Sequence, residues 1–230
     1  MSSNRAIILF VRDERLEAAA KPLPGRYRHA GYRSLNNRVL SRTAHLAAAG
    51  IDLIVAGEGS GTGRFAQALA QRGASFGERI TNAISDAFAI GYEQVVIIGN
   101  DCPELAQSDI TEAFQRLNNG AALVAAPSRD GGAYLLAAQS GTFNPDAFIS
   151  LPWQTGTLFE AICLLPGTAS LTTIRDDFDD WTGRSALHAL DRLFGRHRFA
   201  PAVRLHPAPA AASARLRALA RIHLPAPPSY

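Results

Sequence analysis

Cysteine is scarce in this chain of 230 residues, since only Cys102 and Cys163 are present and neither lies in a CxxC pair. That spacing excludes a zinc ribbon and a thioredoxin-type redox motif. A chain of this length does not depend on a disulfide, and nothing in the sequence indicates secretion. Long hydrophobic runs are also missing, because the first apolar segment is too short for a signal peptide or a membrane span. We therefore expect a cytoplasmic protein with no membrane span.

Charged residues are sparse as well, at 19% of the chain against 47% hydrophobic residues. This balance is typical of a globular protein with a sizeable core. The formal net charge is +3 and the sequence pI is about 9.2, which indicates either arginines that solvate the surface or a pocket for anionic ligands such as nucleotides. The dense Lys/Arg stripe with interleaved aromatics that marks nucleic-acid binding is missing, so no nucleic-acid partner is expected.

Several common motifs of nucleotide binding and hydrolysis are missing too. Neither GxxxxGK[ST] nor GxGxxG occurs, which argues against a P-loop and against a dinucleotide-binding turn. Neither GxSxG nor HExxH occurs, and the six histidines are scattered, so no hydrolase triad and no zinc protease site is predicted.

Short apolar runs alternate with segments of helical periodicity along the chain. The pattern predicts strands at residues 6–11, 52–56, 94–98, 122–126 and 133–138, and helices at 34–49, 64–71, 76–90, 107–117 and 185–194. Residues 12–31 and the glycine-rich residues 57–63 are predicted as loops.

The order of these elements indicates how the strands run. One helix separates the strands at 94–98 and 122–126, which predicts a βαβ unit with two parallel strands. Asp130-Gly131-Gly132, between the strands at 122–126 and 133–138, favours an antiparallel hairpin. We therefore predict an α/β fold with a mostly parallel, mixed sheet, in one domain over residues 1–200. Residues 201–230 form a Pro/Ala-rich tail in which a short basic helix at 211–222 is the only predicted element.

Carboxylates at three places are candidates for chemistry. Asp101 directly follows the strand at 94–98, where ligands of open α/β sheets bind, and is a natural ligand for Mg²⁺ or Mn²⁺. Its alternative role is to cap the turn or the next helix. Asp130 is followed by two glycines that let a ligand approach the backbone, although Asp-Gly is also a common hairpin turn. Asp177 and Asp179 alternate, so both can face one cation, unless they lie in a solvated loop.

Basic side chains follow the first predicted strand. Arg12, Lys21 and Arg26, with Arg15 and Arg28 near them, could neutralise a diphosphate or a triphosphate.

Taken in order, several short segments are similar to a known family. They are Gln71-Arg72-Gly73, Phe76-Gly77-Glu78-Arg79, VVIIGNDCPEL, an AAPxxDGGAYLLA stretch, Leu151-Pro152-Trp153-Gln154-Thr155 and Asp177-Phe178-Asp179. This order resembles a largely uncharacterised bacterial family assigned to glycosyltransferases of the nucleotide-diphospho-sugar transferase superfamily. The resemblance covers residues 71–181, about half of the chain. It implies a three-layer α/β/α, Rossmann-like fold of the GT-A type.

The resemblance also implies roles for individual residues. Asp101 matches the aspartate of the family's metal site, where Asp179 and Asp177 would complete the coordination of Mg²⁺ or Mn²⁺. Asp130 would act on the acceptor or the phosphates, as the second catalytic residue. The acceptor side would include Gly131, Gly132, Trp153 and Thr155, and the nucleotide side would include Gln71, Gly73, Gly77 and Arg79, with Arg12, Lys21 and Arg26 as phosphate ligands.

The chain departs from the family pattern in its first basic segment, where the usual K-T-R-L motif is absent. Asn100, Phe76 and Ala133 replace the family's serine, leucine and tyrosine. Three functions follow as hypotheses. The first is glycosyl transfer from a nucleotide sugar to a small-molecule acceptor. The second is nucleotidyl transfer from a nucleoside triphosphate to a phosphorylated or hydroxylated acceptor, and the third is a non-catalytic role in nucleotide binding or scaffolding.

Overall fold

The structure is a computed structural model that describes residues 4–20, 31–48, 50–58 and 68–176. The strands are β1 (Arg5–Arg12), β2 (Asp52–Glu58), β3 (Ala68–Ala70), β4 (Gln94–Ile98), β5 (Leu123–Pro127), β6 (Ala133–Gln139) and β7 (Thr168–Ser170). The helices are α1 (Glu14–Ala20), α2 (Gly31–Ala48), α3 (Phe76–Ala89), α4 (Gln107–Asn118), α5 (Pro145–Ile149) and α6 (Leu158–Cys163).

All seven strands form a single sheet in the order β3-β2-β1-β4-β6-β5-β7. β1 pairs in parallel with β2 on one side and with β4 on the other. β6 is antiparallel to both of its neighbours, β4 and β5. The remaining pairs, β2 with β3 and β5 with β7, are parallel, so the sheet is mostly parallel and mixed, as predicted.

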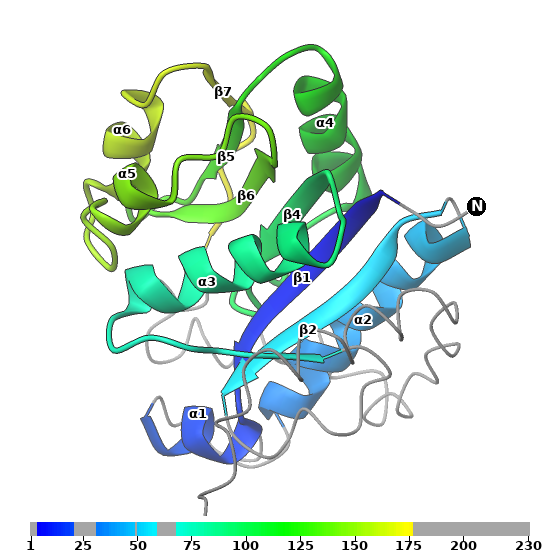
Figure 1. The fold of residues 1–230 in the computed structure, drawn as a ribbon. Coiled ribbons are helices and arrows are strands. Elements are labelled where there is room, and N and C mark those ends of the chain that lie inside the picture. The colour runs from blue at the N-terminus through cyan, green and yellow to red at the C-terminus, as the bar shows by residue number, and fades with distance from the viewer. Residues whose placement is uncertain (1–3, 21–30, 49, 59–67, 177–230) are drawn as a thin grey trace, which may run out of the picture.

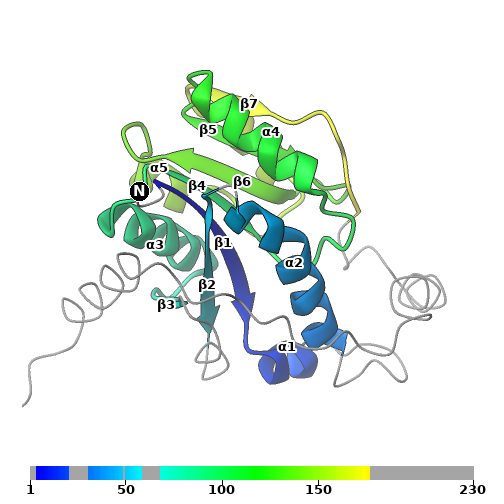
Figure 2. The same cartoon turned by 90° about the vertical axis from the view of Figure 1, so that its right-hand side faces the viewer.

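Helices cover both faces of the sheet (Figures 1 and 2). α3, α5 and α6 lie on one face and α2 and α4 on the other, which gives the predicted three layers. Because successive side chains of a strand point to opposite faces, β1 supplies both cores: Ala6 and Ile8 pack towards α3, and Ile7 and Leu9 towards α2 and α4. Burial on both faces explains why these strands are continuous apolar runs in the sequence.

The topology defines where a ligand can approach. From β1 the chain returns through α2 to β2 on one side, and later passes through α3 to β4 on the other side. The two connections lie on opposite faces of the sheet (Figure 2), so β1 and β4 flank a topological switch point. Ligands of open α/β sheets bind beyond the carboxyl ends of the strands at such a point. Asp101 comes shortly after the carboxyl end of β4.

Two predicted elements are wrong. Residues 14–20 were expected in a loop but form helix α1, which begins after Asp13, whose carboxylate accepts a hydrogen bond from the Arg15 backbone N–H at 2.9 Å. Such capping is a local signal at the N-terminus of a helix. Residues 68–70 were expected in a helix but form β3, because edge pairing with β2 overrides a weak helical propensity.

Other predictions are confirmed in coarser form. β4 and β5 run in the same direction, as the βαβ pattern predicted, but β6 lies between them. The turn at residues 130–132 joins β5 and β6 as an antiparallel hairpin.

The predicted helices at 185–194 and 211–222 and the Pro/Ala-rich tail lie outside the described residues. Both cysteines are free, and none of the described helices has the length and apolar character needed to cross a membrane.

Candidate functional site

Two adjoining cavities open beyond the carboxyl ends of β1 and β4. The larger, of about 370 Å³, lies between the ends of β4 and β6 and the segment that precedes α6. The smaller, of about 150 Å³, lies between the end of β1, α1 and the start of α3. Four residues line both cavities: Phe10, Phe76, Asp101 and Gln154. Ligand pockets usually measure roughly 300 to 1,000 Å³, so the large cavity alone can hold a small molecule, whereas the small cavity suits part of one.

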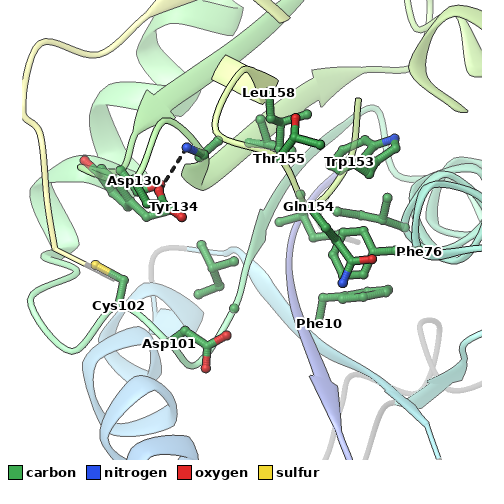
Figure 3. Close-up of a pocket in the computed structure, with 18 of the residues that line it drawn as sticks. Phe10, Phe76, Asp101, Cys102, Asp130, Tyr134, Trp153, Gln154, Thr155 and Leu158 are labelled. Carbon is green, nitrogen blue, oxygen red and sulfur yellow. Dashed lines mark hydrogen bonds between the residues drawn. The ribbon is translucent and has the colours of Figure 1, made fainter. Parts of the chain in front are cut away.

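Asp101 is half-buried and lines both cavities. Figure 3 shows its carboxylate among the residues of the large cavity. The loop that carries it is fixed from α2, where the Arg42 guanidinium donates hydrogen bonds to the carbonyl oxygens of Pro103, at 2.7 Å, and Leu105. Burial lowers the pKa of Arg42, and the charges of Cys102 and Glu104 offset part of that shift. The buried Asn100 amide donates to Asn36 Oδ1 at 2.7 Å, so this departure from the family pattern helps to hold the loop on α2.

The small cavity gathers the predicted nucleotide-side residues Arg12, Gln71 and Arg79 beside Asp101. The amide nitrogen of Gln71 donates to the carbonyl oxygens of Val11 and Ala56, both at 3.0 Å, and so ties together the carboxyl ends of β1 and β2. Glu17 of the unpredicted helix α1 also lines this cavity and lies 3.9 Å from the Arg12 guanidinium.

Asp130 sits at the rim of the large cavity, in the turn between β5 and β6. Its Oδ1 accepts hydrogen bonds from the Ser128 hydroxyl, at 2.5 Å, and from the Gly132 backbone N–H, at 2.9 Å. These bonds form an Asx-type turn, so the structural role considered from the sequence is present. The side chain is nevertheless exposed, and its Oδ2 has no hydrogen-bond partner among the described residues.

The turn at Asp130 packs closely against the segment that precedes α6. Gly131 has a φ of +86°, and a Cβ placed on it would lie 2.0 Å from the Gly156 carbonyl oxygen. The Gly131 carbonyl accepts a hydrogen bond from the Phe159 backbone N–H at 3.0 Å. Gly131 therefore packs behind the cavity, while Gly132, Trp153 and Thr155, the other predicted acceptor-side residues, line it.

Trp153 is held in place by close packing on α3. A Cβ at Gly77 would lie 2.5 Å from Trp153 Cδ1, so only glycine lets the indole lie against the helix there. The indole N–H donates to the Phe148 carbonyl oxygen at 2.9 Å. The ring is also 5.6 Å from that of Phe76, centroid to centroid, and Figure 3 shows both rings on the side of the cavity opposite Asp130.

Among the described residues, the predicted nucleotide-side glycines Gly73 and Gly77 line neither cavity. Gly73 has a φ of +130° and lies against Glu78, whose carboxylate accepts hydrogen bonds from the backbone N–H groups of Ala74 and Ser75 and caps α3. The backbone bonds from Ser75 and Ala74 lower the pKa of the Glu78 carboxyl. Gly73 and Gly77 thus have packing roles at the start of α3, and their predicted nucleotide contacts stay predictions. Lys21, Arg26, Asp177 and Asp179 lie outside the described residues.

Sequence analysis missed several residues of the site. Phe10, Phe76, Tyr134 and Gln154 line the large cavity, but each belongs to an ordinary strand, helix or loop pattern. Gln154 alone has a distinctive backbone, since it is the only non-glycine residue with a positive φ, +62°, among the described residues. A left-handed backbone at a non-glycine residue costs energy and is common at ligand sites. No pattern in one sequence reports that conformation.

We expect Gln154→Gly to separate stability from ligand binding. Glycine adopts this φ without strain, so the variant should be as stable as the parent or more stable by up to about 1 kcal/mol. It should bind ligands less well, because the amide at the junction of both cavities is lost. Urea unfolding measures the first effect and ligand titration the second. Gln115→Gly, at an exposed position in the last turn of α4, is the control and should lose up to about 1 kcal/mol. A similar loss in Gln154→Gly would contradict the prediction.

Tyr134 lines the inner end of the large cavity against a buried ion pair. The Arg175 guanidinium donates to both carboxylate oxygens of Asp109, at 2.7 and 2.8 Å, and lies 5.7 Å from the centre of the Tyr134 ring. Burial, followed by the negative charge of Asp109, raises the pKa of Tyr134 to about 12. The bond to Asp109 raises the pKa of Arg175.

This pKa predicts how stability changes in alkali. Between pH 10 and 12 the unfolded chain loses the Tyr134 proton while the folded protein keeps it, so the free energy of unfolding falls as pH rises. The loss from this group should reach roughly 2 kcal/mol by pH 12. In Tyr134→Phe that part of the pH dependence should disappear, which urea unfolding from pH 9 to 12 measures. Parallel pH profiles for the two proteins would refute the assignment.

A metal ion at this site would have few protein ligands among the described residues. Within residues 4–20, 31–48, 50–58 and 68–176, no three His, Cys, Asp or Glu side chains gather closely enough to hold a metal ion. Magnesium in nucleotide sites usually takes one or two protein carboxylates and draws its other ligands from phosphates and water. Asp101 lies between the small cavity, which contains Arg12 and Arg79, and the large cavity, which contains Asp130. A single carboxylate at this position fits a metal site whose other ligands are phosphate oxygens and water.

Comparisons with known proteins agree with this architecture. Residues 33–155, just over half of the chain, match the model of a family described as "Uncharacterized protein conserved in bacteria (DUF2064)". A protein of Desulfovibrio desulfuricans G20, provisionally described as a nucleotide-diphospho-sugar transferase, has 22% sequence identity and a TM-score of 0.68, with 96% of this chain and 98% of that one covered. CMP:2-keto-3-deoxy-manno-octonic acid synthetase in complex with CTP has 12% identity and a TM-score of 0.51, over 82% of this chain and 96% of that one. No curated protein matches the chain.

Proposed function

Because the chain belongs to the bacterial DUF2064 family and has the fold of nucleotide-diphospho-sugar transferases, we propose that it is a metal-dependent transferase that uses a nucleotide-activated donor. The transferred group is most simply a glycosyl group, moved to a small-molecule acceptor. The observation that carries this proposal is the position of Asp101. Its carboxylate lines the small cavity, which contains Arg12 and Arg79, and the large cavity, which contains the exposed carboxylate of Asp130. Asp101 therefore stands where a donor and an acceptor would meet.

The small cavity supports binding of the donor phosphates. Arg12 and Arg79 are cationic donors of hydrogen bonds, and arginine binds phosphate oxygens in bidentate fashion. Asp101, together with the phosphates, would hold Mg²⁺ or Mn²⁺, and Asp177 and Asp179 are proposed as further ligands. A divalent cation supplies stabilisation of the charge that develops on the departing diphosphate.

The large cavity supports binding of the acceptor, and Asp130 is the proposed base. In glycosyl transfer, the acceptor oxygen forms a bond to the anomeric carbon while the bond from that carbon to the diphosphate breaks. The nucleoside diphosphate leaves with the electron pair, and the acceptor proton passes to the Asp130 carboxylate. Oδ2 of that carboxylate, which no described residue engages, lies at the cavity rim and fits this role, since Oδ1 is engaged in the turn.

Nucleotidyl transfer is the second candidate, because the fold is shared with a synthetase that binds CTP. The same cavities would then hold a nucleoside triphosphate and an acceptor, and the α-phosphorus would be attacked with release of pyrophosphate. The fold alone does not distinguish the two reactions, since one architecture hosts both. The chemical nature of the donor distinguishes them.

A thermal-shift screen tests the proposal directly. The purified chain is incubated with nucleotide sugars or nucleoside triphosphates, each with Mn²⁺, with Mg²⁺ or with a chelator. A donor at about one hundred times its Kd should stabilise the folded state by about 2.7 kcal/mol, and only with the metal present. A shift with one nucleotide sugar supports glycosyl transfer and identifies the donor, and a shift with a triphosphate alone moves the assignment to nucleotidyl transfer. No shift with any of these ligands would overturn both reactions and leave a non-catalytic scaffolding role.

A further inference from the structure

The large cavity has an apolar wall built from aromatic rings that pack on one another. The ring of Phe76 lies 5.6 Å from Phe10 on one side and 5.6 Å from Trp153 on the other, centroid to centroid. Leu136 and Leu158 extend this wall, and both are buried. Because the Trp153 N–H is already bonded to the Phe148 carbonyl, the indole offers the cavity an apolar surface and no hydrogen-bond donor. Preformed apolar walls of this kind bind the body of a ligand by burying its surface.

The described residues that line this cavity carry negative charge but no positive charge. They include Asp101 and Asp130, and none of them is a lysine, an arginine or a histidine. The arginines of the site line the small cavity instead. Arg175, which lies near the Tyr134 ring, is engaged by both carboxylate oxygens of Asp109. An anionic group placed here would face two carboxylates and no cationic partner among the described residues, which opposes binding of a phosphate or carboxylate.

The carboxylate of Asp130 at the rim has an oxygen that is available to a ligand. Oδ1 of Asp130 accepts two hydrogen bonds from within the turn, whereas Oδ2 has no partner among the described residues. A carboxylate oxygen in this state is an acceptor for a hydroxyl group. The cavity therefore combines an apolar wall, an acceptor for a hydroxyl group and a volume of about 370 Å³.

From these three features we infer that the large cavity binds the second substrate as a non-phosphorylated alcohol. That molecule has an aromatic or branched aliphatic body against Phe10, Phe76 and Trp153, and a hydroxyl group directed at Asp130. The inference rests on the proposed function, because it specifies the acceptor of that reaction. It also narrows the nucleotidyl-transfer candidate to a hydroxylated acceptor, since it excludes a phosphorylated one.

Two matched probes test the inference: 2-phenylethanol and its phosphate monoester share one apolar body and differ in charge. Each is titrated into the full chain at low salt, where charge effects are least screened, without nucleotide or metal. Trp153 fluorescence reports binding in a Trp181→Phe background, which leaves one tryptophan. The alcohol should perturb Trp153, and the phosphate ester should bind at least about tenfold more weakly. An alcohol that leaves the Trp153 emission unchanged, or an ester that binds equally well or better, overturns the inference.

A pair of carboxylate variants then tests the part played by Asp130. Asp130→Asn should weaken binding of the alcohol and reduce the preference for the alcohol over the ester, because one negative charge and one acceptor are lost. Asp146→Asn removes an exposed carboxylate from the first turn of α5, outside both cavities, and should keep the full preference. Equal preferences in the two variants would overturn the role of Asp130.

The probes also keep this inference separate from the proposed function. Their binding requires neither donor nor metal, so it is measured independently of the thermal-shift screen. Binding of the alcohol without any nucleotide-dependent shift would leave the large cavity as an alcohol site and remove the transferase assignment. A nucleotide-dependent shift together with a preference for the phosphate ester would keep the transferase and overturn the acceptor class.

Discussion

Asp101→Asn is expected to reduce transfer activity by about 10³-fold while leaving the protein folded. The substitution keeps the size of the side chain but removes the negative charge at the boundary of the two cavities. A neutral amide is a poor ligand for Mg²⁺ or Mn²⁺, so the charge that develops on the leaving diphosphate would lose several kcal/mol of stabilisation. The metal-dependent part of the thermal shift should disappear in the same variant. Turnover of the donor identified in the screen, measured at saturating Mn²⁺, checks the expectation.

Asp146→Asn is the matched control for this experiment as well. It makes the same chemical change on the exposed first turn of α5 and should keep parental activity and the parental metal-dependent shift. Urea unfolding of both variants without ligand separates a loss of function from a loss of fold. If Asp101→Asn retained metal-dependent turnover, Asp101 would not be a metal ligand. Its role would then be structural, as a cap of the turn or of the helix that follows.

Gly131→Ala is expected to cause the largest loss of stability of any single methyl addition near the site. The new Cβ would lie 2.0 Å from the backbone oxygen of Gly156, and backbone moves aside less readily than the end of a side chain. The φ of +86° adds strain of about 1 kcal/mol, and overpacking typically adds 1 to 3 kcal/mol, so a loss of about 3 kcal/mol is expected. Urea unfolding measures it. Binding of 2-phenylethanol should weaken as well, because Thr155 and Gly156 would have to move.

Gly141→Ala provides the comparison for this variant. Gly141 lies just after β6 without a left-handed backbone, and no atom lies within 4 Å of the position that its Cβ would take. Alanine there should change the free energy of unfolding by less than about 0.5 kcal/mol. A loss of similar size in both variants would show that the contact between Gly131 and Gly156 is not what holds the turn.

The secondary structure was predictable wherever burial was strong. β1 and β4 are buried on both faces and appear in the sequence as continuous apolar runs, and α3 shows helical spacing followed by a glycine. α1 was missed because none of its residues is buried, so it has no apolar stripe to detect. β3 was mistaken for a helix because its three residues, Ala-Leu-Ala, have no strand propensity of their own and form a strand only by pairing with β2.

The candidate site was predictable only where a residue stands at the end of an element. Asp101 and Asp130 follow strands, so their place at the carboxyl edge of the sheet could be inferred. Gly77 looked like part of a nucleotide-binding segment, but a single sequence could not show that Trp153, some 76 positions later, needs the space that a Cβ would fill. Phe10 and Gln154 carry no local signal of their place in the cavities.

The sequence by itself therefore determined the α/β class, the mixed sheet and the position of Asp101, since these follow from the spacing of apolar residues and from turn residues between neighbouring elements. The tertiary structure alone decided that β6 enters between β4 and β5, that Gln71 ties β1 to β2, and that arginines and carboxylates divide between two cavities. These features depend on contacts between segments far apart in the chain. Burial and charge at such contacts are properties of the packed molecule, and no local pattern of residues encodes them.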